Sequence, residues 1–331
     1  MIITRTPFRM SFFGGGTDMA AFYKEYGGAV LSTTFDKYCY VNIRHLPRFF
    51  DYRTHLTYSK TEYVNQVDEI QHPLIREAMR FLDIREIRLM YDADLPARSG
   101  LGTSSSFAVG MLNAFYALKG KRVDSRRLAD EAIYLERELC HEAGGVQDQI
   151  AAAYGGLNRI DMDHNGYTVK PIVLSNQRKK QLNENLLLFF TGFSRFSADI
   201  QKKTEENIDQ KKQQLLEMKA MVDEAESILI SKEDLSAFGR LLDVSWRLKR
   251  SLSASISTDV IDEVYAAAIR AGALGGKLLG AGGGGFLLFY VEKERQLAVR
   301  QALQELLYVP FLFETAGPQV VHYTAEDYDI E

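Results

Sequence analysis

Apolar positions in the first half of the chain alternate between short strand-like runs and longer runs with helical spacing. Residues 9–13 are predicted to be a strand that stops at three glycines, and Ile87–Leu95 is predicted to be another strand. Ser105–Lys119 follows with apolar residues at helical spacing, and residues 150–154 have the same character. The segment Thr168–Leu174 is predicted to be the strand that closes this half.

The second half opens with an apolar run, Leu186–Gly192, that is typical of a buried strand. The charged segment Ser197–Ile230 is predicted to be an amphipathic helix with a solvated face. Further helix, a glycine-rich segment and a terminal pair of strands complete this half. A length of 331 residues suggests about two domains. We therefore expect an α+β chain with domains at residues 1–175 and 176–331.

Composition excludes several classes of protein. A net charge of −4 and a pI near 6.0 argue against a nucleic-acid partner. Apolar runs such as residues 286–291 are far shorter than a membrane span of roughly 20 residues, and the N-terminus lacks an apolar signal core. The two cysteines, Cys39 and Cys140, are expected to stay reduced, and the six histidines lack zinc-ligand spacing. We expect a cytoplasmic protein without a membrane partner.

The loop Leu95–Ser106 places glycines and hydroxyls between a predicted strand and a predicted helix. Free backbone N–H groups and the helix dipole at such a point form an anion site, and a phosphate is its usual occupant. The alternative is an ordinary helix cap with a tight turn.

Two other glycine clusters favour the phosphate interpretation. Gly14–Gly16 interrupt the first strand just before Asp18, and seven of the 25 glycines lie between Gly275 and Gly285. The second of these clusters fits the dinucleotide pattern G-x-G-x-x-G, but a strand follows it instead of preceding it, so we reject that interpretation. The chain also lacks a Walker A motif and the tripeptides of protein kinases.

In this order, PFRMSFFGGGTD, PARSGLGTSSS and KLLGAGGGGF resemble the three motifs of the galactokinase, homoserine kinase, mevalonate kinase and phosphomevalonate kinase (GHMP) superfamily. The resemblance spans residues 4–289. GGGTD, residues 136–156 and TGFSR look most like bacterial D-glycero-D-manno-heptose 7-phosphate kinases. The resemblance implies an N-terminal domain like ribosomal protein S5, a C-terminal ferredoxin-like domain, and a site between them.

The resemblance also implies roles for individual residues. The residues expected to bind the nucleotide phosphates are Ser99, Gly100, Leu101, Gly102, Thr103, Ser104, Ser105 and Ser106. Ser104 and Glu136 match the family's Mg²⁺ ligands, although Glu136 alone also suits an exposed helix face. Asp148 matches the catalytic base, with helix capping as the alternative, and Arg9 matches the basic residue beside it, with a solvent-facing strand position as the alternative.

Galactokinases carry Gly-Glu-His-Thr-Asp where this chain has Gly14–Asp18, which suggests a pocket for a larger sugar. The residues expected to bind the sugar are Gly15, Gly16, Thr17, Asp18, Gly145, Arg195, Gly282 and Gly283. Arg195 is the first candidate to hold a distal phosphate of the sugar, because arginine favours bidentate phosphate contacts. The other candidates are Arg247, Lys249 and Arg250.

The expected function is ATP-dependent phosphorylation of the C1 hydroxyl of D-glycero-D-manno-heptose 7-phosphate, giving the 1,7-bisphosphate. ATP, Mg²⁺ and the sugar phosphate are the expected ligands, and a second copy of the chain, in a homodimer, is the expected protein partner. One alternative is a C1 kinase for another sugar such as fucose, and a second is a sugar-sensing homologue without catalysis. The joint presence of Arg9, Ser104, Glu136 and Asp148 argues against the sensing homologue.

Overall fold

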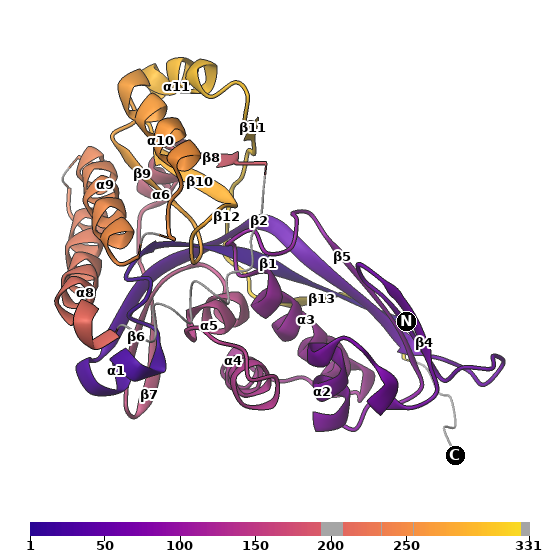
Figure 1. Cartoon of the computed structure of the whole chain (residues 1–331). Coiled ribbons are helices and arrows are strands. Elements are labelled where there is room, and N and C mark those ends of the chain that lie inside the picture. Colours follow the sequence, from indigo (N-terminus) through magenta and orange to yellow (C-terminus); the bar gives the residue numbers. More distant parts are fainter. Residues whose placement is uncertain (193–207, 233, 254, 326–331) are drawn as a thin grey trace.

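The computed structural model describes residues 1–192, 208–232, 234–253 and 255–325. Within these residues the strands form one nine-stranded sheet and one four-stranded sheet. Figure 1 shows the larger sheet crossing the molecule, with first-half helices below it and second-half elements above it. The same described residues include no helix that is long and apolar enough to cross a membrane.

The larger sheet is built around a long antiparallel pair, β1 (Ile2–Phe13) and β2 (Gly28–His45). The first part of β2 pairs with β6, and its last part pairs with β5, so one strand serves two regions of the sheet. The other strands of this sheet are β3 (Thr54–Thr57), β4 (Thr61–Val64), β5 (Ile87–Ala93), β6 (Leu157–Asp163), β7 (Gly166–Pro171), β12 (Phe313–Glu314) and β13 (Gln319–Tyr323).

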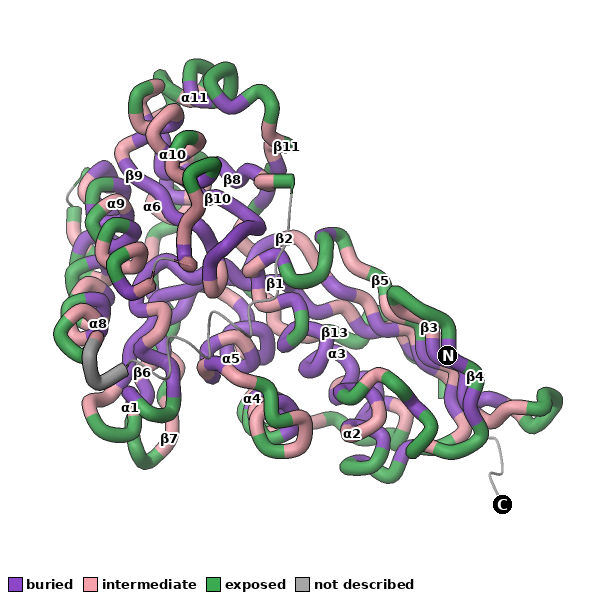
Figure 2. Tube along the Cα trace, in the orientation of Figure 1, coloured by how far each residue is buried: buried purple, intermediate pink, exposed green. Residues whose placement is uncertain are grey.

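Helix α3 (Thr103–Leu118) lies centrally below this sheet and is buried on nearly every side. A helix that is apolar all round must be covered all round, and Figure 2 shows α3 surrounded by sheet and helices. The other helical segments of the first half are α1 (Ala20–Tyr26), η1 (Val67–Glu69), α2 (Pro73–Phe81), α4 (Ser125–Tyr134), η2 (Leu135–Leu139) and α5 (Gln147–Tyr154).

The smaller sheet is antiparallel throughout, with strand order β11-β8-β10-β9. Its strands are β8 (Leu186–Phe190), β9 (Gly275–Leu278), β10 (Phe286–Tyr290) and β11 (Leu307–Tyr308). The helical segments of this half are α6 (Asn176–Glu184), α8 (Ile208–Ile230), α9 (Ser236–Ser251), α10 (Asp259–Ala271), η3 (Lys293–Arg295) and α11 (Gln296–Ala302).

The two halves share a hydrophobic core. Phe238 of α9 packs edge-on against Phe12 and Phe13 of β1, with ring centroids 5.4 and 5.1 Å apart. Helix α8 adds Val222 and Ala225 to the same cluster. The second half of the chain thus covers part of the sheet face that is opposite α3, over β1 and β2, and leaves the end with β3 and β4 uncovered.

Most predicted elements are present, with shifted ends. The strand expected from Ile87 ends at Ala93, and the helix expected from Ser105 begins at Thr103, directly after Gly102 in a left-handed conformation. The charged helix is present over Ile208–Ile230, and the expected part at 197–207 lies outside the described residues.

The expectation that a terminal strand pair completes the second half is wrong. The last two strands return to the larger sheet, where β12 pairs with β2 and β13 pairs with β1. They extend a sheet whose other strands come from the first half, so sheet membership does not follow a division at residue 175.

Candidate active site

The glycine loop at residues 96–102 connects β5 to α3 and presents the N-terminus of α3. Gly100 and Gly102 have φ of 83° and 70°, a region that L side chains rarely adopt. A Cβ at Gly100 would lie 2.4 Å from the Leu279 carbonyl oxygen, and one at Gly285 would lie 2.2 Å from that of Ser99. The third glycine motif therefore packs against the loop and supports its shape. The free N–H groups at the start of a 16-residue helix suit a phosphate.

Arg9 of β1 and Asp148 of α5 form a two-pronged ion pair beside this loop. The Nε and Nη2 atoms of Arg9 donate to the Asp148 carboxylate oxygens, both at 2.8 Å. Arg9 Nη1 also donates to the Gly100 carbonyl at 2.8 Å, which ties the pair to the loop. Asp148 lies in the first turn of α5, whose N-cap is Val146, so Asp148 does not cap this helix.

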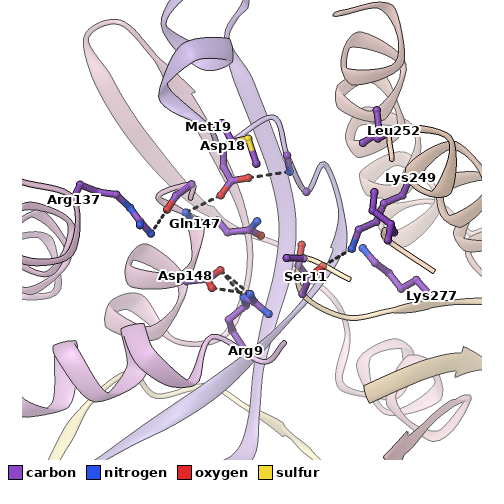
Figure 3. Close-up of a pocket in the computed structure, with 16 residues that line it drawn as sticks. Arg9, Ser11, Asp18, Met19, Arg137, Gln147, Asp148, Lys249, Leu252 and Lys277 are labelled. Carbon is purple, nitrogen blue, oxygen red and sulfur yellow. Dashed lines mark hydrogen bonds and ion pairs between the residues drawn. The ribbon is translucent and has the colours of Figure 1, made fainter. Parts of the chain in front are cut away.

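Asp18 lies near this pair on the segment after the first glycines, and it is buried (Figure 3). Its carboxylate accepts hydrogen bonds from the backbone N–H groups of Gly16 at 3.0 Å and Gln147 at 3.3 Å. Burial, followed by the nearby charge of Asp148, raises the pKa of Asp18. A Cβ at Gly145 would lie 1.8 Å from Asp18 Oδ2, so only glycine allows this approach.

A pocket opens between these two aspartates and the second half of the chain. Its lining includes Arg9, Asp18, Gly15 and Gly16 from the first motif, together with Gly145 and Asp148. The second half contributes Lys249, Lys277, Gly280 and others. The pocket is thus formed where the two halves meet, which is the expected location.

Glu136 lies in the short π-helical segment η2 and is buried. Its Oε2 atom accepts hydrogen bonds from Gln149 and, at 2.8 Å, from the Ser105 hydroxyl, while Oε1 has no hydrogen-bond partner. Burial, followed by repulsion from Glu142, raises the pKa of Glu136 to about 7. The serine that contacts Glu136 is thus Ser105, whereas Ser104 is exposed at the start of α3.

Several predicted sugar-binding residues have structural contacts instead of lining the pocket. The Thr17 hydroxyl is buried and donates to the carbonyl oxygens of Gly14 at 2.8 Å and Ala29 at 2.9 Å. Gly282 and Gly283 pack against the backbone of Ile256. Arg195, the first candidate for the phosphate anchor, lies outside the described residues.

The three anchor candidates on α9 differ in where they lie. Arg247 is 74% exposed at its side chain and pairs with Asp243, and Arg250 pairs with Asp262. Only Lys249 lines the pocket.

Sequence reasoning missed four polar residues of the pocket, namely Ser11, Arg137, Gln147 and Lys277. Arg137 holds the loop before α5, because its guanidinium donates to the carbonyls of Glu142, Ala143 and Gly145 at 2.7–2.8 Å. A lysine within the apolar and glycine-rich run at 275–289 was a signal that could have identified Lys277.

Family models agree with this arrangement. The models for the GHMP kinase N-terminal domain and the GHMP kinase C-terminal domain match residues 70–156 and 225–309, about half of the chain together. The chain belongs to the GHMP kinase family. This membership confirms the predicted superfamily and the predicted α+β fold class with its two family domains.

Individual relatives of this GHMP kinase include sugar kinases. A D-glycero-alpha-D-manno-heptose 7-phosphate kinase of Campylobacter jejuni is 28% identical over 319 residues, which cover 92% of this chain and 93% of that protein. An L-fucokinase/L-fucose-1-P guanylyltransferase of Bacteroides fragilis is 31% identical over 220 residues, 63% of this chain and 22% of that protein. The crystal structure of a D-glycero-D-manno-heptose 1-phosphate kinase from Bacteroides thetaiotaomicron shares the fold, with a TM-score of 0.79 and 24% identity over 98% of this chain and all of that one.

Proposed function

We propose that this GHMP kinase transfers the γ-phosphoryl group of ATP to the C1 hydroxyl of D-glycero-D-manno-heptose 7-phosphate, giving the 1,7-bisphosphate. The observation that carries this proposal is the Arg9–Asp148 pair, which touches the glycine loop on one side and lines the pocket on the other. The similarity to the Campylobacter jejuni heptose 7-phosphate kinase over nearly the whole chain supports this acceptor.

Asp148 is the proposed base. Its carboxylate would accept the proton of the C1 hydroxyl as the oxygen bonds to the γ-phosphorus and the bond from that phosphorus to the bridging oxygen breaks, releasing ADP. Arg9 holds the carboxylate by two hydrogen bonds. Its guanidinium would also stabilise negative charge on the transferring group.

Mg²⁺ fits the residues around Glu136. This buried carboxylate has one oxygen without a partner, and carboxylate and hydroxyl oxygens are the ligands that Mg²⁺ prefers. Among the described residues there is no group of three or more His, Cys, Asp or Glu side chains that could hold a metal. A site with one carboxylate and one serine, completed by nucleotide phosphates, is consistent with that finding. The proposed ligands are Glu136 and Ser104, and the bound ion would neutralise charge on the nucleotide phosphates.

Fucose phosphorylation is the second candidate, because two fucokinases are 28% and 31% identical to about two thirds of this chain. The chain covers only 22% of each of those proteins, which carry a second enzyme activity in their names. A non-catalytic sugar sensor remains the third, and it would bind sugar without releasing ADP.

ADP release with Mg²⁺ and ATP, measured over a panel of acceptors, tests the proposal. Heptose 7-phosphate should be the best substrate, ahead of the free heptose and fucose. Heptose 1-phosphate is the matched control, because its C1 oxygen is already phosphorylated. Faster turnover of fucose would overturn the proposed acceptor, and the absence of turnover with every sugar would overturn the proposed catalysis.

A further inference from the structure

Two lysine ammonium groups from the second half of the chain face the pocket. Lys249 of α9 donates to the carbonyl oxygen of Leu278 at 3.3 Å and also to that of Gly280. Lys277 of β9 is buried, and its Nζ donates to the Phe12 carbonyl at 2.8 Å. In Figure 3 both lysines lie across the pocket from Asp18 and Asp148. An ammonium group has three N–H donors, so one donor of Lys249 and two of Lys277 are left for a ligand.

The pocket carries more positive than negative charge. Its lining holds four cationic side chains, Arg9, Arg137, Lys249 and Lys277, but only two carboxylates, Asp18 and Asp148. Arg9 and Asp148 neutralise each other as an ion pair. Neither lysine has an ion-pair partner among the described residues, and burial lowers the pKa of both. An excess of buried positive charge is costly unless an anion compensates it.

The hydroxyl of Ser11 is a third donor in the same pocket. Ser11 is 6% exposed, and its Oγ has no hydrogen-bond partner. Ser11 precedes Phe12 in β1, and the Phe12 carbonyl accepts a hydrogen bond from Lys277 Nζ. The Lys277 ammonium group therefore contacts β1 at the residue next to Ser11. Buried hydroxyls are nearly always hydrogen-bonded, which points to a ligand oxygen as the missing partner.

We propose that Ser11, Lys249 and Lys277 form a subsite for the anionic group of the acceptor, a phosphate monoester. This inference rests on the proposed function, since it assigns the distal phosphate of the sugar to these three residues. These donors come from β1, α9 and β9, and a phosphate monoester offers three terminal oxygens to accept from them.

The nucleotide phosphates are the competing occupant, and the pocket geometry disfavours them. None of the residues 99–106 lines the pocket, although Gly280, which does, packs against Gly100 and accepts a hydrogen bond from Lys249. The lysines share the pocket with Asp18 and Asp148, which are proposed to contact the acceptor, and this favours the acceptor phosphate over the nucleotide phosphates.

The test compares Lys249→Met with Arg247→Gln, a matched control on the same helix whose side chain is exposed. KM is measured for heptose 7-phosphate, for the free heptose and for ATP. We expect Lys249→Met to raise KM for the 7-phosphate by about 10–100-fold, the loss of a charge-assisted hydrogen bond. KM for the free heptose and for ATP should stay within about threefold of wild type, as should every constant of Arg247→Gln. Ser11→Ala should act in the same direction as Lys249→Met with a smaller effect.

Equal increases in KM for phosphorylated and free heptose would overturn the subsite, and so would an increase for ATP alone. Inorganic phosphate, titrated calorimetrically onto protein saturated with ADP and Mg²⁺, separates this inference from the proposed function. If neither heptose is turned over, the proposed function fails, yet phosphate that binds wild type and not Lys249→Met still supports the subsite. If Lys249→Met binds phosphate as wild type does, the subsite is wrong. Melting temperatures of all variants establish that they are folded.

Discussion

At the residue scale, the site depends on contacts between side chains that are far apart in the sequence. Arg9 and Asp148 are separated by 139 positions, yet they share two hydrogen bonds of 2.8 Å. Planar, bidentate pairs of this kind fix both partners in orientation as well as in charge. The pair therefore presents a carboxylate in a defined position at the wall of the pocket.

Asp148→Asn tests this carboxylate. The amide keeps the shape but cannot accept a proton, so kcat should fall by about 10²–10⁴-fold while ATP still binds. Steady-state kinetics and nucleotide binding measure the two effects. Asp161→Asn is the control, because Asp161 pairs with Arg159 in another part of the sheet.

Near-wild-type turnover by folded Asp148→Asn would contradict the assignment. A loss below about tenfold would instead indicate that Asp148 positions the acceptor, since phosphoryl transfer needs little early proton removal.

The affinity for the phosphorylated acceptor should depend on pH through Lys249. Burial, followed by repulsion from Arg9, lowers the pKa of Lys249 to about 8, and Asp18 opposes that shift. Lys277 also faces this group, and burial lowers the pKa of Lys277 as well. The ammonium form of Lys249 is the form that binds the phosphate. The affinity for the phosphorylated acceptor is therefore highest below the pKa that Lys249 has in the protein without acceptor. Above that value KM should increase by up to about tenfold for each pH unit.

Steady-state KM measured between about pH 7 and about pH 9 checks this dependence, because a phosphate monoester with a second pKa of about 6 stays a dianion over that range. Lys249→Met should remove most of the dependence. A KM that falls as the pH increases would contradict the assigned role.

At the element scale, turns and irregular helices present the functional groups. Helix α3 starts directly after Gly102, and α5 starts two residues after Gly145, so that Asp148 occupies its first turn. The π-helical segment η2 carries Glu136 inward, towards the start of α3. Single-turn π segments are rare and occur frequently at functional sites.

The Mg²⁺ requirement should change when this junction is altered. Ser104→Ala and Glu136→Gln should each raise the Mg²⁺ concentration that gives half-maximal rate at fixed ATP, because each removes a proposed ligand oxygen. Ser105→Ala distinguishes Ser104 from Ser105 as the serine ligand of Mg²⁺, since the Ser105 hydroxyl contacts Glu136 in the structure. If only Ser105→Ala and Glu136→Gln alter the Mg²⁺ titration, Ser105 is the ligand. If none of the three does, these residues are structural.

At the scale of the whole molecule, the two halves are expected to unfold together. Strands β12 and β13 are hydrogen-bonded to the first-half strands β2 and β1, and Phe238 packs on Phe12 and Phe13. Neither half buries its own apolar surface alone, because one hydrophobic cluster contains residues of both. The pocket between the halves is therefore held by a continuous core.

Phe238→Ala tests this coupling. Truncation of a fully buried phenylalanine should lower the free energy of unfolding by about 3–5 kcal/mol, and denaturation should remain a single transition. Chemical denaturation followed by circular dichroism and by fluorescence of the single tryptophan, Trp246, gives both quantities. Leu297→Ala is the control, because Leu297 is 69% exposed. Two separated transitions would contradict a shared core.

The sequence by itself determined the features that depend on near neighbours. Apolar runs predicted the strands at Ile87 and Leu186, and helical spacing predicted α3, because burial of one face imposes a local period. The three glycine motifs predicted a phosphate loop and identified the family, because close backbone approach requires glycine at particular positions.

Only the tertiary structure decided how distant segments meet. No local sequence pattern predicts that β12 and β13 return to the larger sheet, since an exposed strand has the same pattern of residues in either sheet. The pocket location of Lys249, in contrast to Arg247 and Arg250 on the same helix, depends on how α9 packs against β1. The contact of Glu136 with Ser105 depends in the same way on how η2 lies against α3. The physical reason is that hydrophobic period reports burial but not the identity of the partner, which is set by packing across the whole chain.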